Sequence, residues 1–81
     1  MEKNPDLIAL GQTLRRLRRE AKLTQEELAA RAGLSANYVG EIERGERNPS
    51  VLALYQIARG LRVSPSALFE VGPDPISPSA K

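Results

Sequence analysis

The residues best suited to do chemistry in this chain are its basic side chains. Five of them fall within eight positions, namely Arg15, Arg16, Arg18, Arg19 and Lys22. Guanidinium and ammonium groups this close together indicate a local basic surface that would bind an anionic partner. The same spacing also fits the solvated face of a helix, and the charges by themselves favour neither interpretation.

The composition excludes several kinds of site. The 81 residues include no cysteine and no histidine, and the net charge is +2. A disulfide framework, a thiolate metal site and a cysteine nucleophile are therefore impossible, and the usual general base at neutral pH is missing. Catalysis by carboxylates alone is the one easy route left, and no pair of acids is placed in anything resembling a pocket. We expect no enzyme and no cofactor.

The chain also lacks the patterns of export and membrane insertion. It begins MEKNPD, without a charged and then apolar segment, and no apolar run approaches the roughly 18 residues of a membrane span. We therefore expect a cytoplasmic protein with no membrane partner. A chain of this length forms one domain at most. We place that domain at residues 1–71 and expect a flexible tail at 72–81, where prolines are frequent and apolar residues few.

Apolar periodicity predicts an all-α fold of five helices. In the first helix, residues three and four apart form one stripe, made of Leu7, Leu10, Leu14, Leu17 and Ala21. Shorter stripes mark the next three helices: Leu28, Ala29 and Ala32, then Val39 and Ile42, then Leu54, Ile57, Ala58 and Leu61. The stretch SPSALFE predicts a short fifth helix.

Capping residues predict where these helices begin and end. Thr24 and Glu27 have the spacing of a capping box. Glycine is the common stop signal, because it adopts the left-handed conformation at little cost. The other expected starts are Asn4 before Pro5, Ser35, Ser50, and Ser64 before Pro65, and the expected stops are Gly33 and Gly45.

The second and third helices are joined by the short turn AGLS at residues 32–35. Such a turn suits two helices that meet at a steep angle, as in a helix-turn-helix unit, which projects its second helix into the major groove of DNA. A generic helical hairpin fits the turn about equally well. At this point the sequence supports both interpretations.

A longer motif resembles one family. The stretch LTQEELAARAGLSANYVGEIERGERNPS, residues 23–50, is similar to the signature of the Xre family of helix-turn-helix regulators, which includes the lambda and Cro-type repressors. The flanking segments LGQTLRRLRREAKLTQ and LALYQIARGLRVSPSALFE also fit, so the resemblance extends over about residues 10–70. It implies a five-helix lambda-repressor-like domain with a helix-turn-helix at 24–44. The small size is similar to that of controller proteins of restriction-modification systems.

The resemblance implies a set of residues that contact double-stranded DNA. Gln25 corresponds to a phosphate-binding glutamine, and Asn37 to a reader of base edges whose amide can pair with adenine. Ala36 can offer only a methyl group, and Tyr38 serves packing or phosphate contact with equal likelihood. The full expected set is Thr24, Gln25, Ser35, Ala36, Asn37, Tyr38, Gly40, Glu41, Arg44, Arg47 and Asn48.

Gly40 raises a separate question, because a glycine inside a helix costs about 1 kcal/mol relative to alanine. A helical projection of residues 35–44 turns Gly40 outward with Asn37, Glu41 and Arg44. We therefore expect Gly40 to provide clearance for DNA. Glu41 either accepts a hydrogen bond from cytosine or orients a neighbouring arginine, and the sequence leaves both open.

Two further roles follow from the resemblance. One is an ion pair between Arg18 and Glu43 that ties the first helix to the third and fixes their geometry. The other is dimerisation through the last helix, with a two-fold dimer that presents two third helices about 34 Å apart. The expected interface residues are Val63, Leu68, Phe69 and Val71.

The function predicted from sequence is that of a homodimeric, sequence-specific transcriptional regulator of a palindromic operator, with no small-molecule effector. The alternative is a protein-interaction module of the same fold, such as an antitoxin or an adaptor. Glu41 and Glu46 keep this alternative open, because acidic residues at the candidate surface would repel DNA.

Overall fold

The computed structural model describes residues 4–70, and this part of the chain is helical without strands. Its elements are α1 (Pro5–Glu20), α2 (Gln25–Ala32), α3 (Ala36–Glu43), α4 (Val51–Leu61) and a 3-10 helix, η1 (Pro65–Phe69). The all-α prediction is confirmed. The predicted fifth helix is a single short 3-10 segment, a form common in such brief pieces because few bonds can form. The predicted tail at 72–81 lies outside the described residues.

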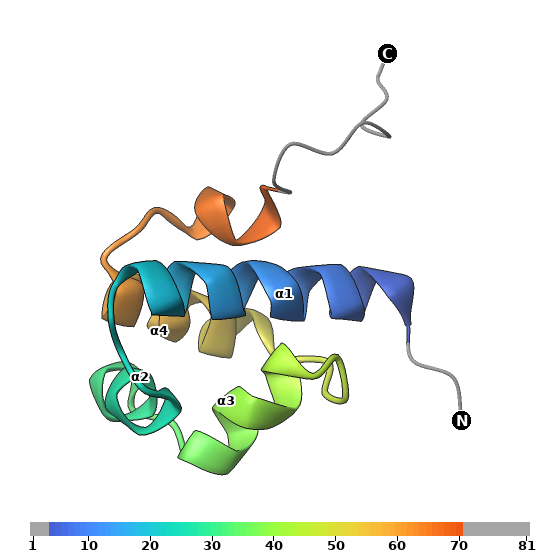
Figure 1. Ribbon diagram of the computed structural model, residues 1–81. Coiled ribbons are helices and arrows are strands. Elements are labelled where there is room, and N and C mark those ends of the chain that lie inside the picture. The colour runs from blue at the N-terminus through green and yellow to red at the C-terminus, as the bar shows by residue number, and fades with distance from the viewer. Residues whose placement is uncertain (1–3, 71–81) are drawn as a thin grey trace.

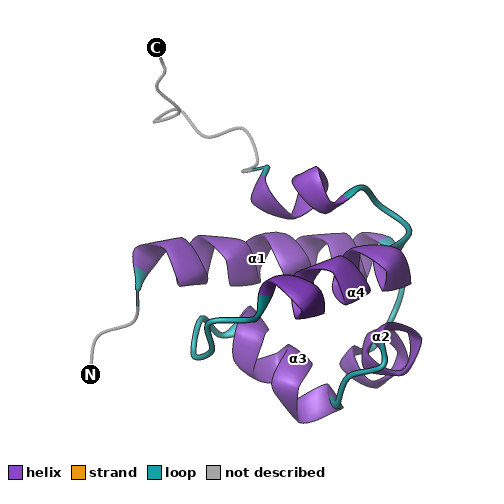
Figure 2. Cartoon of the chain, turned by 180° about the vertical axis from the view of Figure 1, so that it is seen from behind, coloured by secondary structure: helices purple, strands orange, loops and turns teal. Residues whose placement is uncertain are grey.

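The arrangement of the helices leaves α3 and η1 on opposite sides of α1. Figure 1 shows α1 running across the molecule, with α2 and α3 below it and η1 above it. Seen from behind in Figure 2, α4 lies in front of α1 and leads through a loop to η1. None of the helices within residues 4–70 has both the length and the apolar character needed to cross a membrane.

The α-helices begin at the residues that the sequence predicts. The side chains of Asn4, Ser35 and Ser50 each accept a hydrogen bond from a backbone amide of the first turn. Both bonds of the Thr24–Glu27 capping box are present, at 3.0 and 2.8 Å. Ser64 is the N-cap residue of η1, as predicted, but its hydroxyl lies 3.0 Å from that of Ser66 and makes no capping hydrogen bond.

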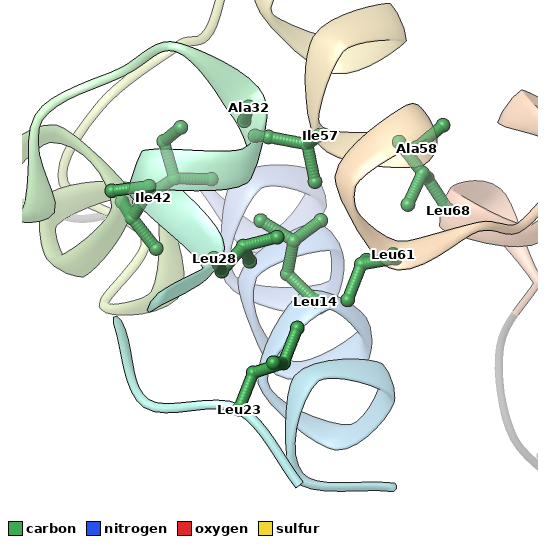
Figure 3. Packing of buried hydrophobic residues seen from close by; sticks show 11 residues of the cluster. Leu14, Leu23, Leu28, Ala32, Ile42, Ile57, Ala58, Leu61 and Leu68 are labelled. Atoms are coloured by element: carbon green, nitrogen blue, oxygen red, sulfur yellow. The ribbon is translucent and has the colours of Figure 1, made fainter. Parts of the chain in front are cut away.

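The core lies where α1, α2, α3, α4 and η1 meet. Figure 3 shows Leu14 of α1 lying between Leu28 of α2 and Leu61 of α4. The large side chains that are fully buried are Leu14, Leu28, Val39, Ile42, Ile57 and Leu68. The predicted stripes supply nearly all of this core. The exceptions are Leu7, which is half-buried and outside the core cluster, and Ala21, which caps the end of α1 and is exposed.

A close approach between α1 and α3 depends on Gly11, which is buried. A Cβ atom at this position would lie within 3.0 Å of the carbonyl oxygens of Ile42 and Glu43, at the end of α3. Backbone carbonyls in a helix cannot swing aside as a flexible side chain can. Gly11 therefore allows the two helices to meet at a distance that no other residue permits.

We predict that Gly11→Ala lowers the free energy of unfolding by about 2 kcal/mol, because overpacking against backbone outweighs the gain in helix propensity. Urea unfolding followed by circular dichroism measures this. Gln12→Ala is the control, since Gln12 is exposed on the same helix, and we expect its effect to stay within about 0.5 kcal/mol. A Gly11→Ala variant as stable as the parent would disprove the close approach.

Candidate functional site

The segment from α2 to α3 is a helix-turn-helix unit with a rigid turn. The connection consists of residues 33–35, between Ala32 and Ala36. Gly33 adopts the left-handed conformation, with φ of 74°, as predicted. The amide of Leu34 donates to the carbonyl of Ala29 at 2.9 Å, and Ser35 caps α3. These bonds set the orientation of α3 relative to α2.

A buried carboxylate joins this unit to α1. Arg18 Nε donates to Glu43 Oε2 at 2.6 Å, and Arg18 Nη2 donates to Oε1 at 3.1 Å. Gln25 Nε2 donates to the same Oε1 at 2.9 Å, and Arg15 Nε does so at 3.4 Å. Arg18 Nη1 also donates to the carbonyl of Leu23, at 2.8 Å. The expected pair of Arg18 and Glu43 is therefore present, within a network that spans three helices.

The electrostatics of Glu43 favour its charged form. Its side chain has no exposed surface, and this burial raises the pKa of the carboxyl. Hydrogen bonds from Arg18, Gln25 and Arg15, together with the charge of Arg18, outweigh burial and hold the pKa below its usual range. The same hydrogen bond raises the pKa of Arg18. Both groups are thus charged at neutral pH.

The first turn of α3 presents one polar side chain to solvent. Asn37 is exposed, and its side chain makes no hydrogen bond to another residue within 4–70. Ala36 and Tyr38 are half-buried and pack against the core, so the methyl group of Ala36 is less available than the sequence suggests. The hydroxyl oxygens of Thr24 and Ser35 accept the capping hydrogen bonds of their helices. Asn37 is therefore the residue of this turn best placed to contact a ligand.

The prediction that Gly40 faces outward is wrong. Gly40 is buried, and a Cβ atom there would lie 3.1 Å from Arg44 Nη1 and 3.4 Å from Gln25 Oε1. The helical projection considers α3 alone, whereas the start of α2 covers this side of it. Gly40 thus brings Gln25 and Arg44 together next to the amino end of α2, which is a position suited to an anion.

Two arginines just after α3 form ion pairs with nearby acids, Arg44 with Glu46 and Arg47 with Glu41. Arg47 Nε and Nη2 both donate to Glu41 Oε1, at 3.1 and 2.8 Å. The Arg47 guanidinium also lies 5.4 Å from the centre of the Tyr38 ring. Arg44 Nε donates to Glu46 Oε1 at 2.9 Å. The contact with Arg47 fits the second of the two roles left open for Glu41, in which it orients a neighbouring arginine.

The five basic residues of α1 and its end do not form one surface. Arg15 and Arg18 turn toward Glu43. Arg16 Nη1 lies 3.3 Å from the carboxylate of Glu20, one turn further along the helix. Arg19 and Lys22 are exposed. The cluster thus divides between a structural network and a solvated helix face.

The expected dimer residues are separated by the fold. Leu68 is fully buried in the core, so its assignment to an interface is wrong. Val63 is half-buried and packs against the core. Phe69 is 64% exposed, which agrees with an interface role. Val71 lies outside the described residues.

Phe69 borders a groove of about 400 Å³ between α1, the start of α4 and η1. Its lining is mostly apolar and includes Leu7, Leu10 and Leu54, with Asn48 also at its border. No cluster of three or more acidic side chains that would hold a metal ion occurs within residues 4–70.

Sequence reasoning missed three exposed apolar residues and two members of the network. Val51, Leu52 and Tyr55 are 70, 65 and 48% exposed. Their spacing forms a second apolar stripe on α4, outside the core stripe, and the sequence alone could have indicated it. Arg15 precedes Arg18 by three positions, which places both on one helix face. The bond of Gln25 to Glu43 left no signal in the sequence, because it depends on how α2 and α3 pack.

The chain is similar to helix-turn-helix proteins, and the helix-turn-helix family HTH_3 matches residues 14–68. An uncharacterised HTH-type transcriptional regulator of Sinorhizobium fredii, y4dJ, is 53% identical over 55 residues, which cover 68% of this chain and 71% of that protein. The immunity repressor protein of Bacillus phage phi105 is 41% identical over 61 residues, 75% of this chain and 42% of the repressor.

The fold is also similar to a solved structure. The restriction-modification controller protein C.AhdI from Aeromonas hydrophila superposes with a TM-score of 0.81 at 44% sequence identity. The superposition covers 82% of this chain and 100% of the controller protein chain.

We predict that Glu43→Gln lowers the free energy of unfolding by about 3 kcal/mol at neutral pH, because it leaves the Arg18 charge without its partner. The lowered pKa of Glu43 stabilises the fold above the unfolded value of about 4.3, and this contribution is lost as the pH falls below it. The parent should therefore lose stability in acid more steeply than the variant.

The control for this prediction is Glu20→Gln, which removes an exposed pair with Arg16. We expect a change within about 0.5 kcal/mol and an unaltered pH dependence. Urea unfolding at a series of pH values measures all three proteins. Equal acid sensitivity of the parent and Glu43→Gln would contradict the assigned role of Glu43.

Proposed function

The chain belongs to the helix-turn-helix family HTH_3, and we propose that it is a sequence-specific, DNA-binding transcriptional regulator that acts as a homodimer on a palindromic operator. The proposal includes no cofactor and no small-molecule effector. The single observation that carries it is the outer side of α3 in the helix-turn-helix unit, where Asn37 is exposed on the first turn and Arg44 and Arg47 are exposed just after the helix.

The α3 helix supplies the base contacts in this proposal. In helix-turn-helix proteins the second helix lies in the major groove and reads base edges with its amino-terminal residues. The amide of Asn37 can make a bidentate pair with adenine, and its lack of a partner within residues 4–70 leaves both hydrogen-bonding groups available. Asn37 is therefore the principal base-reading residue that we propose.

Phosphate contacts come from both ends of the unit. The amino end of α2 carries free amides and the positive end of the helix dipole. Gln25 and Arg44 converge beside it at Gly40, and one N–H of the Gln25 amide remains for a phosphate after the bond to Glu43. Arg47 lies on the other side of α3, next to Tyr38. Together these groups would hold the backbone on both sides of the groove.

The geometry weakens the protein-interaction alternative. That alternative depended on Glu41 and Glu46 as acids that repel DNA. Both carboxylates instead accept hydrogen bonds from arginines of the same surface, Arg47 and Arg44. Their charges are therefore balanced locally, and the surface is not acidic. The relatives named as a repressor and a controller protein also favour regulation of genes.

The dimer surface that we propose combines Phe69 with the exposed stripe of α4. Val51, Leu52, Tyr55 and Phe69 are 48 to 70% exposed, and large apolar groups so exposed indicate an interaction site where they gather. Pro49, Leu54 and Phe69 line the same groove, which connects the start of α4 to η1. The described domain measures 38 × 31 × 21 Å. Two such copies side by side are compatible with α3 helices about 34 Å apart, one turn of DNA.

We predict that selection from a random DNA pool yields a palindromic site bound by the parent protein. Asn37→Ala should then weaken binding to that operator by about 1–3 kcal/mol and change binding to random DNA little. Arg47→Ala should weaken binding to both DNAs, to the operator by the larger factor, and lower the salt slope by about one unit. Fluorescence anisotropy at several salt concentrations measures these effects. Equal losses on both DNAs for Asn37→Ala would remove it from the base contacts.

We predict a dimer at about 100 μM, a concentration at which a functional homodimer is well populated. Leu52→Glu should shift the protein to monomer, because it places a charge within the apolar surface. Gln12→Glu introduces the same charge at an exposed position of α1 and should remain dimeric. Sedimentation velocity measures the three proteins. A parent that sediments as a monomer throughout would exclude the homodimer.

A further inference from the structure

Two side chains of α3 contact the guanidinium group of Arg47: Glu41 contacts one edge and Tyr38 one face. Both Nε and Nη2 of Arg47 donate to a single oxygen of Glu41, at 3.1 and 2.8 Å. The Tyr38 ring lies 5.4 Å from the guanidinium carbon, within the range of a cation–π contact. The Tyr38 hydroxyl in turn accepts a hydrogen bond from the amide of Ser50, at 3.4 Å. Glu41 and Tyr38 thus both restrain the Arg47 side chain.

We propose that Glu41 is a positioning residue that sets the orientation in which Arg47 meets DNA, and that it thereby contributes to discrimination between sequences. The proposal rests on the DNA-binding function proposed above. Glu41 itself does not contact a base or a phosphate in this arrangement. It acts through Arg47.

The unoccupied edge of Arg47 is the one that recognises DNA. A guanidinium has five N–H donors, and Glu41 accepts from Nε and Nη2. The edge formed by Nη1 and the second N–H of Nη2 remains available. This edge can make the paired hydrogen bonds that arginine forms with guanine or with phosphate oxygens. Glu41 therefore selects which edge Arg47 presents.

Holding Arg47 before DNA arrives also reduces the entropy lost on binding. A long side chain that is free in solution must be ordered when it makes a directional contact, and this ordering opposes association. Arg47 is 51% exposed, so without Glu41 little else would restrain it beyond the Tyr38 ring. The restraint favours DNA whose acceptors match the held orientation. It gives no advantage on DNA whose acceptors do not match.

Glu41 has an opposing effect, since its negative charge repels phosphates on any DNA. Glu46 provides the matched comparison, because it also accepts from the Nε of a surface arginine through one carboxylate oxygen, at 2.9 Å. Repulsion is independent of base sequence, so it changes the affinities for operator and random DNA by the same factor. Positioning changes their ratio. The two effects are therefore separable by measuring both DNAs.

The experiment measures dissociation constants for the operator selected from the pool and for random DNA. Glu46→Ala should tighten binding to both and leave their ratio unchanged. Glu41→Ala should tighten binding to random DNA similarly but lower the ratio about three- to tenfold, a part of what one bidentate base contact contributes. Glu41→Gln should retain most of the ratio, because its amide oxygen still accepts from Arg47.

A double variant tests whether Glu41 acts through Arg47. In an Arg47→Ala background, Glu41→Ala should leave the ratio unchanged. The Nε–Hε signal of Arg47 in the NMR spectrum of the free protein should show an ordered group in the parent and a mobile one in Glu41→Ala. A structural role unrelated to Arg47 would not produce this change.

Three outcomes overturn the proposal. If Glu41→Ala tightens binding to both DNAs equally, as Glu46→Ala does, Glu41 is only a repulsive charge. If Glu41→Ala lowers the ratio by the same factor with and without Arg47, Glu41 reads bases itself. If the pool yields no preferred sequence for the parent protein, the proposed DNA-binding function fails, and the positioning role fails with it.

Discussion

The buried carboxylate of Glu43 determines how α3 is held against the rest of the domain. It accepts hydrogen bonds from two arginines of α1 and from Gln25 of α2. A buried charge is costly unless it is paired and hydrogen-bonded, so an arrangement that separates these partners is strongly unfavourable. Replacing a buried ion pair by apolar side chains of similar size is often neutral for stability. The network therefore restricts α3 to one orientation more than it adds stability.

The close approach at Gly11 and the Glu43 network lie at the same junction. The carbonyl oxygens that a side chain at Gly11 would strike belong to Ile42 and Glu43, and the Glu43 side chain is the one that α1 holds through Arg18. The helices must be close for an arginine of α1 to reach the carboxylate with both nitrogens. Glycine permits this distance, and the ion pair then fixes the angle at which the helices meet.

Local signals predicted most of the fold, and tertiary contacts account for what they missed. Capping residues such as Thr24 and Ser35 bind backbone amides within three residues, so the helix starts can be predicted from the adjacent sequence. The apolar stripes identify the core for the same reason. Two predictions were wrong because each considered one helix alone. Leu68 was assigned to an interface as surplus apolar surface, and Gly40 was predicted to face outward. In the fold, Leu68 fills the core beside α4 and α1, and α2 covers Gly40.

The candidate site was predictable in its residue types but not in its pairing. The resemblance indicated Arg44, Arg47 and Glu41 as neighbours of DNA, whereas the partner of each depends on loop geometry after α3. Only the Arg18–Glu43 pair could be expected, because the resemblance includes both positions. Arg15 and Gln25 join that pair through packing among three helices. No pattern along the chain encodes this convergence.

The balance of charge on the proposed DNA-binding surface has a consequence for selectivity. Arg44 and Arg47 are each matched by an acid, so this part of the surface gains little from general attraction to phosphates. Non-specific binding, which depends on that attraction, is therefore kept weak. Specific binding depends more on directed hydrogen bonds, and these remain when the donors are held in place. A regulator must find its operator among a great excess of other sites, so the ratio of the two affinities matters more than either alone. Both acids lower total affinity, and Glu41 favours this ratio because it holds Arg47 in place.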